Sequence, residues 1–350
     1  MATRGKQLVA DALSGLPVAR VPVGPLAVHF CARIAGVTTR EYTTQARTLA
    51  ECVIRYYERF QPDAVWVSAD TWVSAEAMGA HVGATGDDQP FGGLGGPAVR
   101  TVADIDRIPP PNPATQGRYP LMIEALGRVV DALGRDAFIV ACFDQYPFSL
   151  AAALLGLSEM MLKLSDDPPL VEALMERCLE YGMAYGRALA SVGADLLSGG
   201  DSPAGLIGPA AYRRFARPFE RRLISGLKAG NSKPVSLHIC GQATALLTSM
   251  AATGADVLEI DHQVDLAAAC RIAGSGVVLW GNLDPVGVLA RGTPAEVEHA
   301  AHEAVEAARS AGHRRFVLSS GCTLAMETPA ANLEALTRAA QSSEDPGFSR

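Results

Sequence analysis

The sequence has no excess of positive charge and no long apolar segment. It has 30 Lys and Arg residues and 37 Asp and Glu residues, which gives a formal net charge of −7, and no clustered basic face is evident from the sequence. This balance argues against a nucleic-acid partner. No stretch approaches the roughly 18 uninterrupted apolar residues of a membrane span, so we expect no membrane partner. Met1–Gly5 lacks the apolar centre of a signal peptide, and we therefore expect a cytoplasmic protein.

The sequence also lacks grouped cysteines and a nucleotide-binding glycine motif. Its 7 cysteines are odd in number and scattered, which favours reduced thiols over a disulfide framework. No Gly-x-Gly-x-x-Gly follows the first expected strand, so a dinucleotide-binding open sheet loses its usual support. The glycines within His81–Pro120 form no phosphate-binding pattern.

Short apolar runs alternate with helical periods along the chain. The runs are nearly continuous, as expected for strands of a parallel sheet buried on both faces. Eight strands are expected: Val21–Phe30, Ala64–Ala69, Phe138–Phe143, Asp195–Gly199, Pro234–Cys240, Val257–Ile260, Val277–Asn282 and Phe316–Gly321. Six helical stretches accompany them: Thr39–Phe60, Leu121–Leu133, Leu170–Val192, Pro209–Leu227, Ala243–Ala252 and Ala295–Ala311.

Eight strands with intervening helices in 350 residues predict a single-domain (β/α)8 TIM barrel over residues 1–341. An open doubly wound sheet is the main alternative. Residues 342–350 are expected to form a disordered tail. The Gly- and Pro-rich segment His81–Pro120 follows the second strand, so it is either a lid above the barrel mouth or an ordinary surface insertion.

Polar side chains follow most of the expected strands. The C-terminal ends of barrel strands meet at one mouth, where the chemistry of such barrels takes place. One aspartate after a strand can simply cap a helix or stabilise a turn. So many polar groups at equivalent positions, however, predict an active or binding site. The candidates are Asp70, Asp144, Asp201, His238, Cys240, Glu259, Asp261, Asn282 and Cys322.

His238 and Cys240 form the most informative pair. Residues two apart on a strand point to the same side, so both could bind one ion, and Cys322 ends another strand of the barrel. One imidazole and two thiolates suit zinc and leave a fourth position open, as in catalytic zinc sites. The alternative is that both cysteines are small core residues, as we expect for Cys142.

His29 and Cys31 form a second His-x-Cys pair at the end of the first expected strand. They could also bind a metal ion, although no third soft ligand is obvious nearby. The sequence therefore offers two candidate metal pairs, of which the pair with the distant cysteine is the stronger.

Several segments resemble the uroporphyrinogen decarboxylase superfamily over most of the chain. They are Glu76–Gly79 (EAMG), Gly200–Pro218 (GDSPAGLIGPAAYRRFARP), Ala255–Asp265 (ADVLEIDHQVD), Gly281–Pro285 (GNLDP) and Thr328–Leu333 (TPAANL). One branch of this superfamily is the metal-independent decarboxylase of haem biosynthesis. The other comprises corrinoid-dependent methyltransferases, whose zinc motif is His-x-Cys followed by a distant Cys.

The zinc motif of the methyltransferase branch is matched by His238, Cys240 and Cys322. The decarboxylase instead has Gly-His-Gly where this chain has Gly321–Thr323, and it has paired arginines where Cys31–Gly36 offers Arg33 alone. A tetrapyrrole with many carboxylates needs more cationic partners than that. Asp70 agrees with the decarboxylase, because it occupies the position of the catalytic aspartate of that branch.

The resemblance implies a zinc-dependent transfer of a methyl group from a corrinoid to a small thiol such as coenzyme M. The corrinoid would arrive as free methylcobalamin or on a separate corrinoid protein, and the sequence leaves a homo-oligomer open. The expected zinc ligands are His238, Cys240 and Cys322, with Glu259 or Asp261 as a partner of the imidazole or a displaceable fourth ligand. The expected catalytic residues are Asp70, Asp201 and Glu259, and the expected substrate-binding residues are Asp144, Asp261 and Asn282. A metal-independent decarboxylase and a non-catalytic barrel are the alternatives.

Overall fold

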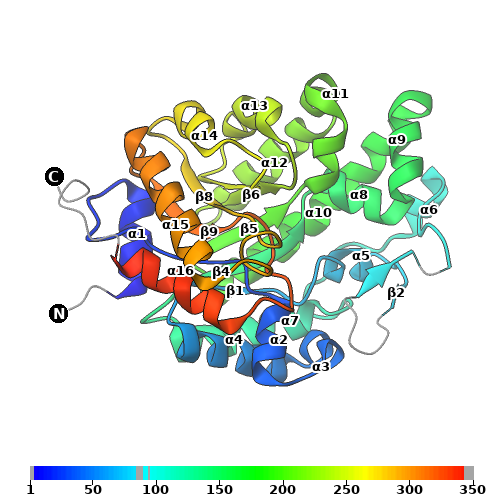
Figure 1. Ribbon diagram of the computed structural model, residues 1–350. Helices are drawn as coiled ribbons and strands as arrows, with labels where there is room; N and C mark the ends of the chain where they lie inside the picture. The colour runs from blue at the N-terminus through cyan, green and yellow to red at the C-terminus, as the bar shows by residue number, and fades with distance from the viewer. Residues whose placement is uncertain (1–3, 84–89, 94, 343–350) are drawn as a thin grey trace.

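The computed structural model describes residues 4–83, 90–93 and 95–342. A parallel sheet of seven strands lies at the centre, and helices cover its outside (Figure 1). The strand order is β1 (Ala64–Val67), β4 (Phe138–Gln145), β5 (Leu196–Gly200), β6 (Ser236–Ile239), β7 (Val257–Ile260), β8 (Val278–Leu283) and β9 (Phe316–Ser320). Seven of the eight expected strands are thus confirmed, and each pairs with its neighbour in sequence along the sheet.

The helices fall largely where the apolar periods predict them. They are α1 (Gly5–Ser14), α2 (His29–Ala35), α3 (Thr39–Thr44), α4 (Ala46–Phe60), α5 (Val73–Ala77), α6 (Val102–Arg107), α7 (Tyr119–Leu133), α8 (Pro147–Leu155), α9 (Leu157–Asp166), α10 (Pro168–Val192), α11 (Gly208–Arg214), α12 (Ala216–Lys228), α13 (Leu247–Ala251), α14 (Leu266–Ala273), α15 (Pro294–Ser310) and α16 (Ala330–Ser342), with short 3-10 turns η1 (Ser202–Leu206) and η2 (Thr244–Leu246). The expected helix Thr39–Phe60 is divided because Gln45 is extended, with φ −131° and ψ 112°.

The strand expected over Val21–Phe30 is wrong. Only an isolated bridge, between Val23 and Leu318 of β9, forms there, and His29 already begins α2. Pro22 and Pro25 explain this, because a proline has no N–H to donate to a strand ladder.

The irregular segment nevertheless lies between the two edge strands of the sheet. Gly24 N donates to the Leu318 carbonyl of β9 at 2.9 Å, and Asp63 N, next to β1, donates to the Val23 carbonyl at 2.8 Å. The structure is therefore a seven-stranded parallel sheet whose edges are joined by an irregular segment, and a complete eight-stranded barrel is not established.

The inside of the sheet is filled near the N-terminal ends of its strands. Trp66 of β1 and Trp280 of β8 pack edge to face there, with ring centroids 6.2 Å apart. Val9 of α1 belongs to the same buried apolar cluster, so α1 closes this end of the sheet. The functional groups must therefore lie at the opposite end, where the strands finish.

The segment His81–Pro120 contains a small antiparallel pair, β2 (Val82–Gly83) with β3 (Phe91–Gly92), followed by α6. Figure 1 shows this part of the chain at the end of the molecule away from α1. Its action as a lid stays a prediction. The predicted tail lies outside the described residues except for Ser342, which ends α16.

Within the described ranges, no single helix is long and apolar enough to cross a membrane. The bent pair of α8 and α9, with an angle of 107° between its members, meets the length and hydropathy criteria when taken together.

Gly24 is expected to be intolerant of a side chain. A Cβ atom there would lie 2.6 Å from Cζ2 of Trp280 and 3.0 Å from Cβ of Ala64, both inside the packed core. Gly24→Ala should therefore reduce the free energy of unfolding by about 1–3 kcal/mol, as overpacking does. Urea denaturation tests this, with Gly230→Ala as the control because a Cβ at Gly230 meets no atom within 4 Å. Equal stability of the two variants would contradict the packing described here.

Candidate metal centre

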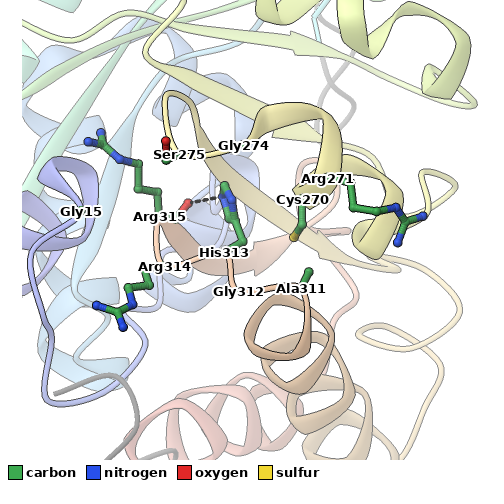
Figure 2. A pocket seen from close by; sticks show the side chains of 10 residues that line it. All are labelled: Gly15, Cys270, Arg271, Gly274, Ser275, Ala311, Gly312, His313, Arg314 and Arg315. Carbon is green, nitrogen blue, oxygen red and sulfur yellow. Dashed lines mark hydrogen bonds between the residues drawn. The ribbon is translucent and has the colours of Figure 1, made fainter. Parts of the chain in front are cut away.

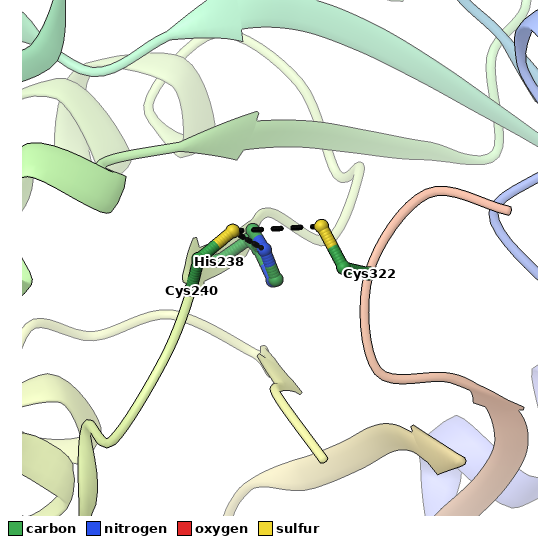
Figure 3. Close-up of side chains that lie close together, drawn as sticks. All are labelled: His238, Cys240 and Cys322. Carbon is green, nitrogen blue, oxygen red and sulfur yellow. Dashed lines mark hydrogen bonds between the residues drawn. The ribbon is translucent and has the colours of Figure 1, made fainter. Parts of the chain in front are cut away.

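The structure brings the three predicted metal ligands together. His238 lies on β6, Cys240 directly follows that strand, and Cys322 lies two residues beyond the end of β9. Nε2 of His238 is 2.9 Å from Sγ of Cys240, and Sγ of Cys240 is 3.5 Å from Sγ of Cys322. Figure 3 shows the three side chains pointing toward one another from two separate segments. Their ligand atoms all lie within 4.8 Å of each other.

The orientation of His238 is fixed by a backbone carbonyl. Its Nδ1 donates to the carbonyl oxygen of Glu259 at 3.0 Å, and the parallel register pairs His238 with Glu259. Nε2 is therefore the nitrogen that faces the two thiols. Of the two residues expected as the partner of the imidazole, Glu259 is the acceptor, through its main-chain oxygen and not through its carboxylate.

The carboxylate of Glu259 is engaged elsewhere. It accepts hydrogen bonds from Ser198 Oγ of β5, at 2.8 Å, and from Ser236 Oγ of β6. Burial raises the pKa of Glu259, while the nearby His238 and the two serines act in the opposite direction. Sequence reasoning missed both serines, because their hydroxyls face the sheet interior from positions that read as ordinary strand residues.

The three ligands are electrostatically coupled. A hydrogen bond from Cys322 lowers the pKa of Cys240, with further help from His238, and the same contact raises the pKa of Cys322 together with burial. Burial alone would lower the pKa of His238, but its contacts with Cys240 and Glu259 raise it to about 9. Cys240 is therefore the more readily ionised of the two thiols.

The donor set fits a zinc ion. Tetrahedral zinc with Zn–S bonds of about 2.3 Å separates two sulfur ligands by about 3.8 Å, close to the 3.5 Å found here. One nitrogen and two sulfurs are a combination that zinc favours, and three protein ligands leave a position for a substrate. A metal ion would also displace the protons that the cluster now holds.

The second His-x-Cys pair does not form a comparable group. His29 and Cys31 lie in the first turn of α2, where residues two apart point to different sides. His29 Nε2 contacts the Ala69 carbonyl at 2.8 Å, and Cys31 Sγ contacts the Ala27 carbonyl at 3.1 Å. Burial raises the pKa of Cys31 well above its ordinary value. Within the described part of the chain, the single metal-ligand group is the one formed by His238, Cys240 and Cys322.

Asp70 lies in an ion-pair network. Arg118 contacts both of its carboxylate oxygens, one of them at 3.1 Å, and Arg118 Nε contacts Glu76 at 2.5 Å. Trp72 N also donates to Asp70 at 2.7 Å. The negative charge of Asp70 is therefore paired with the guanidinium of Arg118. Arg118 was missed at the sequence level, because it lies in the insertion, far from any strand end.

Asp144 lies on β4 and Asp201 directly follows the neighbouring strand β5, and both carboxyl groups are buried. Asp144 adopts the left-handed backbone region, φ 83°, and one of its oxygens accepts from Ser74 N at 2.7 Å while the other has no partner among the described residues. Burial raises the pKa of Asp144 to about 7. Asp201 is fully buried and accepts from the backbone N–H of Ser149 at 2.8 Å and from its hydroxyl at 2.7 Å.

Asp261 and Asn282 lie on the side of the mouth near Cys322. Asp261 Oδ1 accepts from Gln263 N at 2.9 Å and lies 3.0 Å from His262 Nδ1. The side-chain amide of Asn282 donates to the carbonyls of Asp261 and Val264, at 3.2 and 2.9 Å. These contacts organise the loop after β7, against which Gly321 packs so closely that a Cβ there would lie 2.4 Å from His262 N.

A cavity of about 420 Å³ lies away from this centre (Figure 2). Its lining includes Gly274 before β8 and His313–Arg315 before β9, so it opens at the N-terminal ends of these strands. Arg271 and Arg314 point away from each other in Figure 2. This cavity therefore has no convergent set of functional groups.

A smaller cavity of about 300 Å³ lies beside the loops that follow β7 and β8. His262, Asn282 and Asp284 line it together with apolar residues. Of the residues that the sequence assigned to substrate binding, Asn282 lines this cavity.

Comparison with known proteins identifies the family. A family model described as uroporphyrinogen decarboxylase (URO-D) matches residues 4–343. The chain belongs to the uroporphyrinogen decarboxylase family. This family membership confirms the resemblance found in the sequence.

Curated relatives with two different names are similar to the chain. A methylcobamide:CoM methyltransferase of Methanosarcina mazei is 30% identical over 281 residues, which are 80% of this chain and 79% of the relative. A uroporphyrinogen decarboxylase of Synechococcus sp. is 29% identical over 302 residues, 84% of this chain and 82% of the relative. Family membership alone therefore does not distinguish methyl transfer from decarboxylation.

Solved structures agree with the fold. A methyltransferase from Methanosarcina mazei superposes with a TM-score of 0.88 at 25% identity, covering 97% of this chain and 99% of that one. A B12-independent methionine synthase from Shewanella sp. shares the fold at 11% identity, with a TM-score of 0.61 and coverage of 93% and 98%.

Asp144 makes stability depend on pH. Its carboxyl group holds a proton up to about pH 7 in the folded state, but only to its ordinary pKa of 3.8 when unfolded. The stabilising protonated form is complete below pH 3.8 and is lost as the pH rises to about 7. The Asn side chain of Asp144→Asn cannot ionise, so this variant does not lose stability as the pH rises. The difference in free energy of unfolding, variant minus wild type, should therefore be about 1–4 kcal/mol larger at pH 8 than at pH 4.

Urea denaturation at the two pH values measures this difference for Asp144→Asn. Asp131→Asn, at an exposed position of α7, is the control for the loss of an acidic side chain. A stability difference for Asp144→Asn that is the same at both pH values would refute the assignment.

Proposed function

We propose that this protein is a zinc-dependent methyltransferase that moves a methyl group from a methylated corrinoid to a small thiol. The observation that carries this proposal is the convergence of His238, Cys240 and Cys322, with Nε2 of the imidazole turned toward the two sulfurs by the Glu259 carbonyl. The similarity to methylcobamide:CoM methyltransferases supports methyl transfer, and the donor set supports zinc.

Zinc bound here would supply a Lewis acid that keeps a substrate thiol deprotonated at neutral pH. Zinc would be held by His238 as a neutral imidazole and by Cys240 and Cys322 as thiolates, after the protons of the cluster have left. The two negative charges would keep a neighbouring substrate sulfur electron-rich. In the proposed reaction, the substrate sulfur attacks the methyl carbon. The carbon–cobalt bond breaks with its electron pair remaining on cobalt, a carbon–sulfur bond forms, and the thiol proton passes to solvent.

We assign the remaining polar residues of the mouth to support roles. Glu259 orients His238 through its carbonyl, and its carboxylate is held by two serines, so it leaves the fourth metal position to the substrate. Asp261 and Asn282 shape the loop next to Cys322, where we place substrate binding. Asp70, Asp144 and Asp201 position the backbone and side chains around the mouth.

The corrinoid is proposed to reach the mouth either as free methylcobalamin or on a separate corrinoid protein. Coenzyme M is the thiol named for the methyltransferase relatives, and it is the first acceptor to test. We propose a cytoplasmic location, in keeping with the free cysteines.

A metal-independent decarboxylase is the second candidate, and Asp70 is the observation that favours it. Two features weigh against it in this chain. Arg118 occupies both oxygens of Asp70, and Arg33, the one arginine of the Cys31–Gly36 stretch, is bound to the carbonyls of Met326 and Thr328. Both oxygens of Asp70 are then paired with a cation, and Nη1 of Arg33 is already bound, which weighs against their use in binding the pyrrole N–H groups or carboxylates of a tetrapyrrole.

Cys322→Ala should remove the metal and the activity together. Loss of one of three ligands is expected to lower zinc affinity at least about 10-fold, and methyl transfer from methylcobalamin to coenzyme M should become undetectable. Elemental analysis of purified protein and a thiol-consumption assay measure the two effects. Cys31→Ala is the matched control and should retain the zinc content of the wild type. A Cys322→Ala protein with the zinc content and activity of the wild type would contradict the assignment of Cys322 as a zinc ligand.

Removal of zinc by a chelator separates the two candidate functions. The methyltransferase should lose its activity on dialysis against a chelator and regain it when zinc is restored. A decarboxylase would act equally well before and after this treatment. Decarboxylation of uroporphyrinogen by the metal-free protein, with no methyl transfer by the zinc form, would establish the second candidate instead.

A further inference from the structure

Cys322 differs from His238 and Cys240 in the part of the structure that holds it in place. His238 belongs to β6 and Cys240 follows it directly, so the sheet fixes both. Cys322 lies in the loop between β9 and α16, residues 321–329. The geometry of the cluster therefore depends on what holds this loop.

The near end of the loop is held by the sheet. Gly321 N donates to the Leu283 carbonyl of β8 at 2.7 Å, and Gly321 packs against the backbone of His262. Leu26 adds a second attachment, because its N–H donates to Ser320 Oγ at 3.1 Å and its carbonyl accepts from Leu324 N at 3.0 Å.

The far end of the loop is held by a side chain. Arg33 of α2 donates through Nη1 to the Met326 carbonyl and, at 3.2 Å, to the Thr328 carbonyl. Thr39 Oγ1 also lies 3.7 Å from Sδ of Met326. Among the described residues, no carboxylate lies within ion-pair distance of Arg33. Nη1 of Arg33 is thus bound to two backbone carbonyls of the loop that carries Cys322.

We propose that Arg33 is a positioning residue for the metal centre, which holds the loop of residues 321–329 so that Cys322 faces Cys240. The inference rests on the proposed metal site. A charged donor on two carbonyls is stronger than a neutral one. It acts on the loop that carries Cys322, which lies two residues beyond its strand, whereas Cys240 directly follows β6. Loss of Arg33 leaves the sheet, His238 and Cys240 unchanged and frees the far end of the loop.

Three variants test this role. Arg33→Ala should weaken zinc binding about 10-fold, and Arg33→Lys, which keeps the charge but provides a point donor, should recover part of that loss. Arg315→Ala is the matched control, because Arg315 also donates to two backbone carbonyls, those of Leu13 and Ser14, but lies before β9 at the opposite end of the sheet. It should bind zinc as tightly as the wild type.

Two metal measurements give the readout. Competition with a chromophoric chelator gives the zinc affinity, and the thiolate-to-cobalt charge-transfer band of the cobalt-substituted protein reports how many sulfurs bind the metal. In Arg33→Ala the band should fall toward that of a single thiolate. Unchanged affinity and an unchanged band in Arg33→Ala would overturn the proposal, as would an equal loss of affinity in Arg315→Ala.

A third measurement needs no metal. Cys322 of the metal-free protein should react faster with an alkylating reagent in Arg33→Ala than in the wild type, as shown by peptide mass mapping, while Cys31 should not change. An unchanged rate for Cys322 would also overturn the positioning role. Failure of the wild type to bind zinc would instead refute the proposed function, and the alkylation rate would still decide how the loop is held.

Discussion

The parallel pairing of the strands is the constraint on which the candidate site depends. Because all seven strands run in the same direction, their C-terminal ends lie at one end of the sheet, and residues distant in sequence meet there. The register of β6 on β7 then sets His238 opposite Glu259, so that a backbone carbonyl orients the imidazole. A one-residue slip would turn His238 to the other face of the sheet.

The metal cluster combines rigid and adjustable supports. His238 and Cys240 follow the geometry of β6, whereas Cys322 depends on a loop attached to β8, Leu26 and Arg33. A substrate-exchanging metal centre needs ligands that hold the ion while one position stays open. Support from the sheet for two ligands and from side-chain and backbone hydrogen bonds for the third meets that need.

The acidic residues around the mouth serve different physical purposes. Asp70 is neutralised by Arg118, Asp144 is buried with a pKa raised to about 7, and Glu259 is held by two serines. Sequence position placed all of them at strand ends, but their environments separate them.

The sequence by itself determined seven of the strands, most helices, the family and the grouping of His238, Cys240 and Cys322. Buried parallel strands leave continuous apolar runs, and the C-terminal ends of such strands meet at one end of the sheet. The sequence did not determine the segment Val21–Phe30, whose apolar run reads as a strand although Pro22 and Pro25 lack the N–H groups of a ladder. It also could not assign the acceptor for His238, the partner of Asp70 or the role of Arg33. Each of these is a contact between segments distant in sequence, and such contacts are decided when the strands pair and the loops pack.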